Sequence, residues 1–131
     1  MRKCGMMMNR KQIGLLGENY AAQVLRKKGL TIIARNWRCT SGELDLVARD
    51  GDVVVFVEVR TRTLPVSQQS KEQRFGSVLE AVTVQKRTQV KRIAEIYLYQ
   101  HRLAEQSVRF DVVLVEKAGD QLTATHIEHA F

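Results

Sequence analysis

The sequence predicts an α/β domain with a mixed sheet of about five strands flanked by helices, and three observations favour this class. Segments with helical and strand periodicity follow one another in the order helix, three strands, helix, two strands. The most apolar strand, residues 53–60, lies in the middle of this order, as expected at the centre of a sheet that helices cover. A length of 131 residues suits one domain that buries about two-thirds of its unfolded surface.

The first half of the chain is predicted to form one helix and three strands. Residues 13–28 repeat apolar side chains at helical spacing, and Gly29 follows where helix ends favour glycine. Residues 30–35 have the composition of a strand. Residues 42–49 and 53–60 follow as two further strands joined by a tight turn, which makes them a hairpin.

The second half is predicted to form a loop, a helix and two strands. Residues 61–77 are rich in Thr, Ser, Gln and charge and contain the only proline, which predicts a mobile loop. Residues 84–101 form an amphipathic helix, with apolar side chains on one face and basic ones toward solvent. Residues 108–115 read as a strand, and residues 122–128, with polar alternation, as a last strand at a sheet edge.

Charge and cysteine content limit the class of protein. Twenty-one Lys and Arg against fourteen Asp and Glu give a net charge of +7 and a pI near 9.8, which favours nucleic acid over a membrane surface as partner. Cys4 and Cys39 belong to no CxxC pattern, as in a reduced cytoplasmic protein. Residues 1–12 lack the apolar core of a signal peptide and are expected to be a flexible basic N-terminus before the domain at 13–131. No stretch approaches the ~20 apolar residues of a membrane span.

The predicted hairpin gathers acidic side chains on one face of the sheet. The dipeptide Asp50-Gly51 predicts a two-residue type I′ turn, because that turn needs φ above zero at both central positions. Centring the turn there places Glu43 opposite Glu58 and makes Asp45 a diagonal neighbour of Glu58, roughly 7–8 Å away at the backbone. A turn one residue longer would send Glu58 to the other face. The side chains expected on the shared face are Glu43, Asp45, Glu58 and Arg60.

Glu58 interrupts an otherwise apolar strand, where a buried carboxylate is unfavourable unless a partner compensates its charge. With Asp45 beside it, the face carries excess negative charge and favours a divalent cation that prefers oxygen, Mg²⁺ or Mn²⁺, over zinc. Glu43 would be a third ligand, or would raise the pKa of Glu58 by like-charge repulsion. A structural interpretation stays open, in which Arg60 neutralises Glu58 or Asp45.

Other polar residues have simpler interpretations. Asp111 is expected to be structural, bonded to Arg109 or to a neighbouring loop. Trp37 is expected in the core or at its rim rather than stacked on a base. His126 and His129 are three residues apart on a predicted strand and would face opposite ways, so no shared metal is expected.

Basic side chains supply candidate contacts to a nucleic acid. Those of the second helix are either a solvated helix face or phosphate contacts, which position a nucleic acid without reading its sequence. The candidates are Arg62 in the predicted loop and Lys86, Arg87 and Lys91 on the helix.

Several blocks of this sequence together resemble the YraN-like proteins, a bacterial family of the restriction-endonuclease-like superfamily related to archaeal Holliday-junction resolvases. The resemblance covers about residues 14–131. The superfamily's acid followed by (Asp/Glu)-x-Lys is a short pattern, whereas family blocks in this order and spacing are much more specific. The resemblance implies a restriction-endonuclease-like core. The blocks are Glu18, Gly42-Glu43-Leu44-Asp45-Leu46, Phe56-Val57-Glu58-Val59-Arg60 and Arg109-Phe110-Asp111-Val112-Val113.

The resemblance also implies roles for individual residues. Asp45 and Glu58 would be the metal ligands, with the backbone carbonyl of Val59. Glu18 would approach from the first helix as an accessory ligand or water-orienting group, whereas helix geometry alone favours a role at the helix dipole. Arg60 stands where the superfamily usually has lysine, and because an arginine stays charged it can stabilise charge on the phosphate but cannot act as a general base. Water activation would then depend on the metal.

The leading hypothesis is a divalent-metal-dependent endonuclease or nuclease-like protein that hydrolyses DNA phosphodiesters, with branched structures among the candidate substrates and with activity attenuated by Arg60. The alternative is a non-catalytic DNA- or RNA-binding module that keeps the fold, which Arg60 favours. A structural adaptor is a third interpretation. Because related resolvases are two-fold dimers, the resemblance allows a homodimer through the strand near Leu122.

Overall fold

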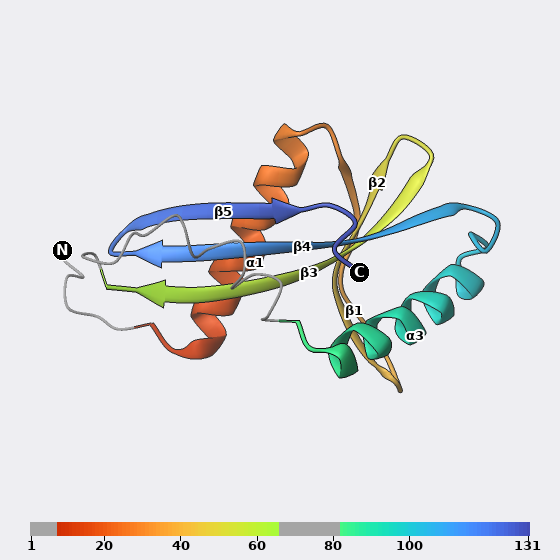
Figure 1. Cartoon of the computed structure of the whole chain (residues 1–131), viewed down its shortest axis with the longest axis horizontal. Coiled ribbons are helices and arrows are strands. Elements are labelled where there is room, and N and C mark those ends of the chain that lie inside the picture. The colour runs from red at the N-terminus through yellow and green to blue at the C-terminus, as the bar shows by residue number, and fades with distance from the viewer. Residues whose placement is uncertain (1–7, 66–81) are drawn as a thin grey trace.

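Two helices and five strands follow one another in the order that the sequence predicts. A computed structural model describes residues 8–65 and 82–131 (Figure 1). In these ranges, neither helix has the length and apolarity needed to cross a membrane. The elements are α1 Arg10–Lys27, β1 Thr31–Cys39, β2 Gly42–Asp50, β3 Val53–Leu64, α3 Val84–Gln100, β4 Ser107–Ala118 and β5 Gln121–Ile127.

One mixed sheet contains the strands in the order β1-β2-β3-β4-β5. Strands β3 and β4 are parallel, and the other neighbours are antiparallel. The strand with Glu58, β3, is the middle strand, and β5 lies at an edge, both as predicted. Helices α1 and α3 pack on opposite faces of the sheet, so the fold has three layers (Figure 1).

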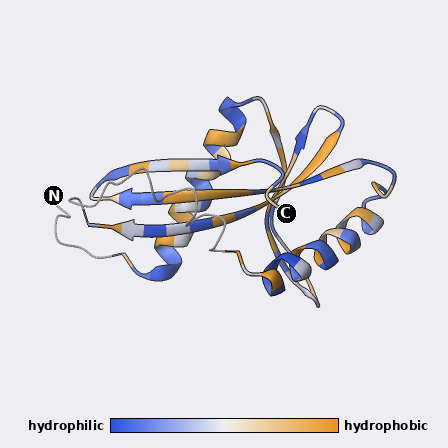
Figure 2. Ribbon diagram, viewed as in Figure 1, coloured by the Kyte–Doolittle hydropathy of each residue, from blue (hydrophilic) through white to orange (hydrophobic). Residues whose placement is uncertain are grey.

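Two apolar clusters hold the helices on the sheet, and β3 contributes to both because successive side chains of a strand point to opposite faces. Apolar residues run along the central strands (Figure 2). Trp37 packs at the margin of the α3 cluster, edge-on to Tyr97 at 5.2 Å between ring centres, which confirms its place in the core. The α1 cluster includes Ala21, Ala22, Leu25, Leu46, Val55, Val57, Val113 and Val115. The α3 cluster includes Leu44, Val47, Val54, Phe56, Val90, Ile93, Ala94 and Tyr97.

Helix α1 begins earlier than the periodicity indicates. Asn9 and Gln12 form a capping box, in which each side chain accepts a hydrogen bond from the backbone N–H of the other, at 2.8 and 2.9 Å. The helix therefore starts at Arg10, and the prediction of a flexible N-terminus is wrong for residues 10–12. Residues 1–7 of that predicted segment lie outside the described ranges.

Strand β3 is longer than predicted. Its pairing with the parallel strand β4 continues to Leu64, opposite Ala118. The polar residues 61–64, predicted as the start of a mobile loop, are therefore strand, because β4 supplies backbone partners along their whole length. Residues 66–77 of the predicted loop lie outside the described ranges.

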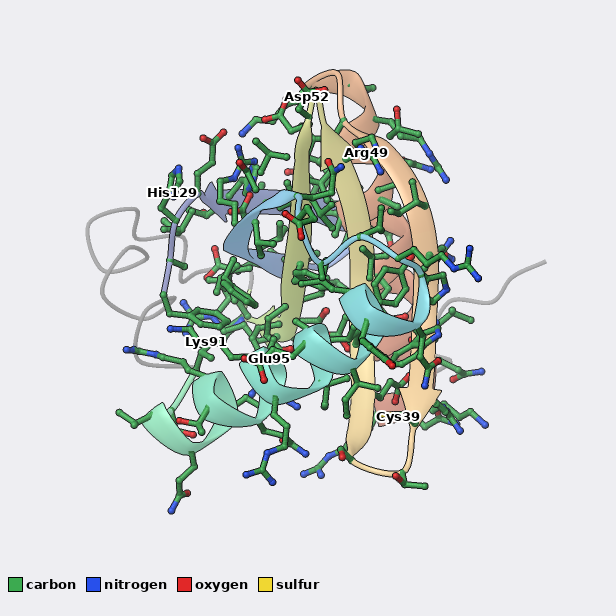
Figure 3. All side chains as sticks on the ribbon, turned by 90° about the vertical axis from the view of Figure 1, so that its right-hand side faces the viewer. Cys39, Arg49, Asp52, Lys91, Glu95 and His129 are labelled. Carbon is green, nitrogen blue, oxygen red and sulfur yellow. The ribbon has the colours of Figure 1, made fainter. Side chains whose placement is uncertain are left out.

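The β2–β3 turn lies one residue later than predicted. Asp50 pairs with Val53, so the two-residue loop is Gly51-Asp52, at the tip of the hairpin (Figure 3). Of these two residues only Gly51 has a positive φ, 61°, as in a type II′ turn rather than type I′. The cross-strand register is shifted by two residues from the predicted one. Because that shift is even, it does not by itself move Glu58 to the other face. Leu44 packs in the α3 cluster and Leu46 in the α1 cluster, however, so the regular alternation of β2 is interrupted at Asp45.

Helix α1 approaches β3 most closely at Gly17. A Cβ atom at this position would overlap the side-chain hydroxyl of Thr61. One turn earlier, a Cβ atom at Gly14 would have no neighbour within 4 Å. Glycine is thus required sterically at residue 17, while residue 14 faces open space.

A buried ionic network ties β4 to its neighbours. Asp111 is fully buried and accepts hydrogen bonds from Nε and Nη2 of Arg109, at 2.9 and 3.0 Å, which confirms the structural interpretation of this residue. Arg109 also donates to Asp50, at 2.9 Å. Nε2 of His126 lies 2.8 Å from Asp111, whereas His129 joins the network only through its backbone N–H. Burial raises the pKa of Asp111, but the hydrogen bonds from His126 and Arg109 outweigh burial and hold that pKa below its ordinary value.

We expect Asp111→Asn to lower the free energy of unfolding by about 3–5 kcal/mol, because it leaves the buried charge of Arg109 without its main partner. Since the folded-state pKa of Asp111 is lowered, its contribution to stability is complete above the ordinary pKa of 3.8 and is lost as pH falls through the folded-state pKa. Urea denaturation at pH 7 and pH 3 measures both effects. The control is Asp120→Asn, in the exposed β4–β5 turn. A loss of less than about 1 kcal/mol would contradict the prediction.

Candidate active site

Asp45 and Glu58 come together on the face of the sheet that α3 covers. The pairing of β2 with β3 extends to Leu46 and Val57, and Asp45 and Glu58 are the next residues beyond this pair on their strands. Beyond that pair the Asp45 side chain occupies the edge of β3, where its Oδ2 accepts the backbone N–H of Val59 at 2.9 Å. The two carboxyl groups also share a hydrogen bond with each other. The predicted convergence of these two acids is therefore present.

Burial and mutual repulsion disfavour two negative charges at this position. Glu58 is 4 % exposed. Burial, followed by the charge of Asp45, raises the pKa of Glu58 to about 7. Burial also raises the pKa of Asp45, against the opposing effect of the hydrogen bond from Val59. Each of the two carboxyl groups is therefore protonated more readily than a free one, as expected for carboxyl groups in contact.

Two cations face the same oxygen of Glu58. Nη2 of Arg60 lies 3.6 Å from Glu58 Oε2, and Nζ of Lys86 lies 3.8 Å from it. The Arg60 contact is the ion pair of the structural interpretation, in which Arg60 neutralises Glu58. The Lys86 contact was not predicted, since Lys86 was assigned only to phosphate binding. A sequence signal existed, because Lys86 lies four residues before the buried Val90 and so on the same stripe of α3.

Glu18 and Glu43 lie near the pair without joining it. Burial, followed by the charge of Asp45, raises the pKa of Glu18, so this α1 residue does approach the site. Glu43 pairs with Arg38 on β1, at 3.6 Å. Its charge raises the pKa of Asp45. The predicted position of Glu43 directly opposite Glu58 is wrong, because the register pairs Leu46 with Val57 and is shifted by two residues from the one that would pair them.

The donor atoms of this site fit a hard divalent cation. Within residues 8–65 and 82–131, no group of three or more His, Cys, Asp and Glu side chains converges on one position. Mg²⁺ commonly takes only one or two carboxylates and completes its shell with water and substrate phosphate. The carboxyl groups of the buried Glu58 and the partly buried Asp45 offer oxygen ligands, which match that requirement better than they match zinc. Asp45 and Glu58 would hold the ion, with the Val59 carbonyl as the third predicted ligand.

The predicted nucleic-acid contacts already have partners within the protein. Arg62 donates from Nε and Nη2 to Oε2 of the buried Glu116, at 2.9 and 2.6 Å. Arg87 donates to the carbonyl of Val82, at 3.0 Å. Lys91, on the α3 side that faces β4 (Figure 3), lies 5.7 Å from the centre of the Phe110 ring. These contacts fix the side chains but leave open whether they also bind phosphate.

A cleft opens beside the carboxyl pair, between α1 and the end of β3. Its volume is about 470 Å³. It shares Val59 and Arg60 with the site already described, and Glu18 borders it from the helix. The lining residues are Arg10, Ile13, Gly14, Glu18, Val59, Arg60, Thr61, Arg62 and Thr63.

The three-layer arrangement, with a helix before a three-strand meander and an acid on the central strand β3 beside one on β2, defines a restriction-endonuclease-like core. The chain belongs to the uncharacterised protein family UPF0102, whose sequence profile matches residues 17–115, and the predicted YraN-like membership is thereby confirmed. A UPF0102 protein of Mycolicibacterium vanbaalenii is 46 % identical over 92 % of this chain and 93 % of its own length. One of Dictyoglomus turgidum is 35 % identical over 95 % of this chain and 100 % of its own.

We expect Glu58→Gln to be more stable than the wild type by about 2 kcal/mol at pH 8 without divalent metal. A carboxyl group whose pKa is raised from 4.5 to about 7 makes the folded state less stable as pH rises through that interval, and glutamine removes this effect. Mg²⁺ or Mn²⁺ should raise the melting temperature of the wild type and not that of the variant.

Thermal unfolding followed by circular dichroism, with and without EDTA, measures both effects. The matched control is Glu95→Gln, an exposed acid on α3. A Glu58→Gln variant that is less stable than the wild type at pH 8 would show that Arg60 and Lys86 compensate the charge of Glu58 fully.

Proposed function

We propose that this protein is a divalent-metal-dependent nuclease that hydrolyses DNA phosphodiesters, with branched structures as its first candidate substrates. The observation that carries the proposal is the contact between the buried Glu58 of the central strand β3 and the partly buried Asp45 of its neighbour β2. Arg60 and Lys86 lie within 4 Å of Glu58, yet burial and the charge of Asp45 still raise the pKa of Glu58 to about 7. The two cations therefore do not fully compensate the pair, and a divalent ion would supply the remaining positive charge.

In this proposal the bound ion supplies Lewis acidity, lowering the pKa of an attacking water and neutralising charge on the phosphate. Arg60 stabilises the charge that develops on the phosphate oxygens and keeps its own proton. Lys86 carries an ionisable ammonium at the same carboxylate. It is therefore placed to orient the water and to exchange a proton with it, the function that Arg60 cannot perform. Glu18 would orient the water from the α1 side.

The proposal includes the location and partners expected from the sequence. DNA is the partner that the charge of +7 favours. The protein would act in the cytoplasm. The edge strand β5 has one strand neighbour in the sheet, so its free side would pair with a second copy in a two-fold dimer.

A non-catalytic nucleic-acid-binding module is the second candidate function. The observation that favours it is Arg60 itself, an arginine where the superfamily has lysine, placed against Glu58 as a neutralising partner. Such a module would bind nucleic acid in a salt-dependent way without cutting it.

We expect the purified wild type to cleave at least one of four labelled DNAs (single-stranded, duplex, flap and four-way junction) in Mg²⁺ or Mn²⁺. Glu58→Gln and Asp45→Asn should abolish cleavage, while Glu95→Gln retains it. Gel electrophoresis of the products, with EDTA added in parallel, measures the activity. Cleavage that survives in both site variants would show a contaminating nuclease and contradict the proposal. Salt-sensitive binding without cleavage by any of the proteins would support the binding module.

We expect Lys86→Gln and Lys86→Arg both to lower the cleavage rate by about 10²–10⁴-fold, the range typical of a residue that takes part in proton transfer. The arginine variant keeps the charge beside Glu58 but does not release its proton. Single-turnover rates at pH 6 to 9 measure the effect, and Lys27→Gln, exposed at the end of α1, is the control. Wild-type activity in Lys86→Arg would show that only the charge of Lys86 is needed.

A further inference from the structure

The cleft between α1 and β3 has the chemical character of an anion site. Three arginines line it, Arg10 from the first turn of α1 and Arg60 and Arg62 from β3, against one acid, Glu18. Guanidinium groups are the preferred partners of phosphate, because their N–H groups match its oxygens in pairs. Its volume of about 470 Å³ falls within the range of ligand pockets, roughly 300–1,000 Å³.

One of these arginines has an unused donor. Nε of Arg60 is buried, and in residues 8–65 and 82–131 it is the one buried side-chain nitrogen or oxygen that has no hydrogen-bond partner. Buried donors are almost always paired, so an isolated one indicates an acceptor that the structure does not contain. The partner of Arg62, by contrast, is Glu116, which holds this guanidinium at the cleft wall.

At one position that lines the cleft, helix α1 has a glycine and therefore no side chain. Gly14 lines the cleft, and a Cβ atom at Gly14 would have no neighbour within 4 Å. At Gly17, one turn further on, the same atom would overlap Thr61. A side chain at residue 14 would therefore enter the cleft without disturbing the packing of α1 on β3.

We infer that this cleft binds a phosphate group of a nucleic-acid chain, next to the one held at Asp45 and Glu58. The inference rests on the proposed function for the identity of the anion. Val59 and Arg60 line the cleft and also contact the two acids, Val59 through its backbone N–H to Asp45 and Arg60 through its guanidinium to Glu58, so the two places adjoin along β3. Arg10 and Arg60 contact the phosphate oxygens, and Arg62 adds charge from the wall. The phosphate is either internal to the strand or a terminal 5′-phosphate, and the two share the same chemistry.

The test uses two cleft variants, one that adds a negative charge and one that removes a positive charge. Each is compared with a variant that makes the same change of charge on α1 outside the cleft. Gly14→Glu places a carboxylate in the cleft, and Gln23→Glu adds the same charge at an exposed position of α1. Arg10→Ala removes a cleft cation, and Arg26→Ala removes one from the last turn of α1. Replacing Gly14 within a helix favours folding, so lost binding would not reflect lost structure, which circular dichroism verifies.

Binding is measured by fluorescence anisotropy in EDTA, where no cleavage occurs, on the four DNAs above with and without a 5′-phosphate. We expect Gly14→Glu to bind about tenfold or more weakly than Gln23→Glu, and Arg10→Ala about three- to tenfold more weakly than Arg26→Ala. The slope of log affinity against log salt should fall by about one for Arg10→Ala. An equal loss on both DNA forms identifies an internal phosphate, and a loss confined to the phosphorylated form identifies a terminal one.

Equal affinities within each matched pair would overturn the inference, and so would a wild type that binds none of these DNAs. The outcomes also separate the inference from the proposed function. Cleft-dependent binding without cleavage in Mg²⁺ or Mn²⁺ would support the inference and count against the nuclease. Metal-dependent cleavage by Gly14→Glu, with the rate and DNA affinity of the wild type, would support the nuclease and count against the inference.

Discussion

The structure depends on a buried acid, Glu58, in contact with a partly buried one, Asp45, at the centre of a sheet that is covered on both faces. Strand β3 lies between β2 and β4 and beneath both helices, so water cannot screen the charge of Glu58. The arrangement around Glu58 follows from this constraint. Arg60 comes from the same strand, Lys86 from α3 and Asp45 from β2, and each compensates or shares the charge. The charge of Glu58 remains only partly compensated, which lowers the stability of the fold, and a bound cation would offset this loss. Local instability of this kind is common at functional sites.

The network on the next strand, β4, shows a different outcome of burying a carboxyl group. Asp111 on β4 is as deeply buried as Glu58, yet its pKa is lowered rather than raised, because hydrogen bonds from His126 and Arg109 satisfy it. Carboxyl groups in the same sheet therefore have opposite electrostatics on neighbouring strands. The carboxylate of Asp111 is compensated within the protein and contributes to the fold, whereas that of Glu58 is compensated only in part.

The sequence predicts the order of elements and the shared face of Asp45 and Glu58, because both depend on local periodicity. The turn was placed one residue early, since Asp50-Gly51 and Gly51-Asp52 are both good hairpin turns and only the backbone angle of Gly51 separates them. Because the error in register was even, it did not by itself move Glu58 to the other face. The roles of Lys86 and Arg62 and the full length of β3 depend on partners in α3 and β4, more than fifty residues away in the case of Glu116, and local patterns do not contain them.

The two glycines of α1 differ in the substitutions that the fold tolerates at their positions. A Cβ atom at residue 17 would overlap Thr61, so a larger residue there would force α1 or β3 to shift. A Cβ atom at residue 14 would meet no neighbour within 4 Å, so a side chain that suits a helix fits there without steric overlap. Descendants of this sequence can therefore lose the cleft by a single substitution at residue 14 while keeping the domain intact, so the cleft and the fold can be selected independently.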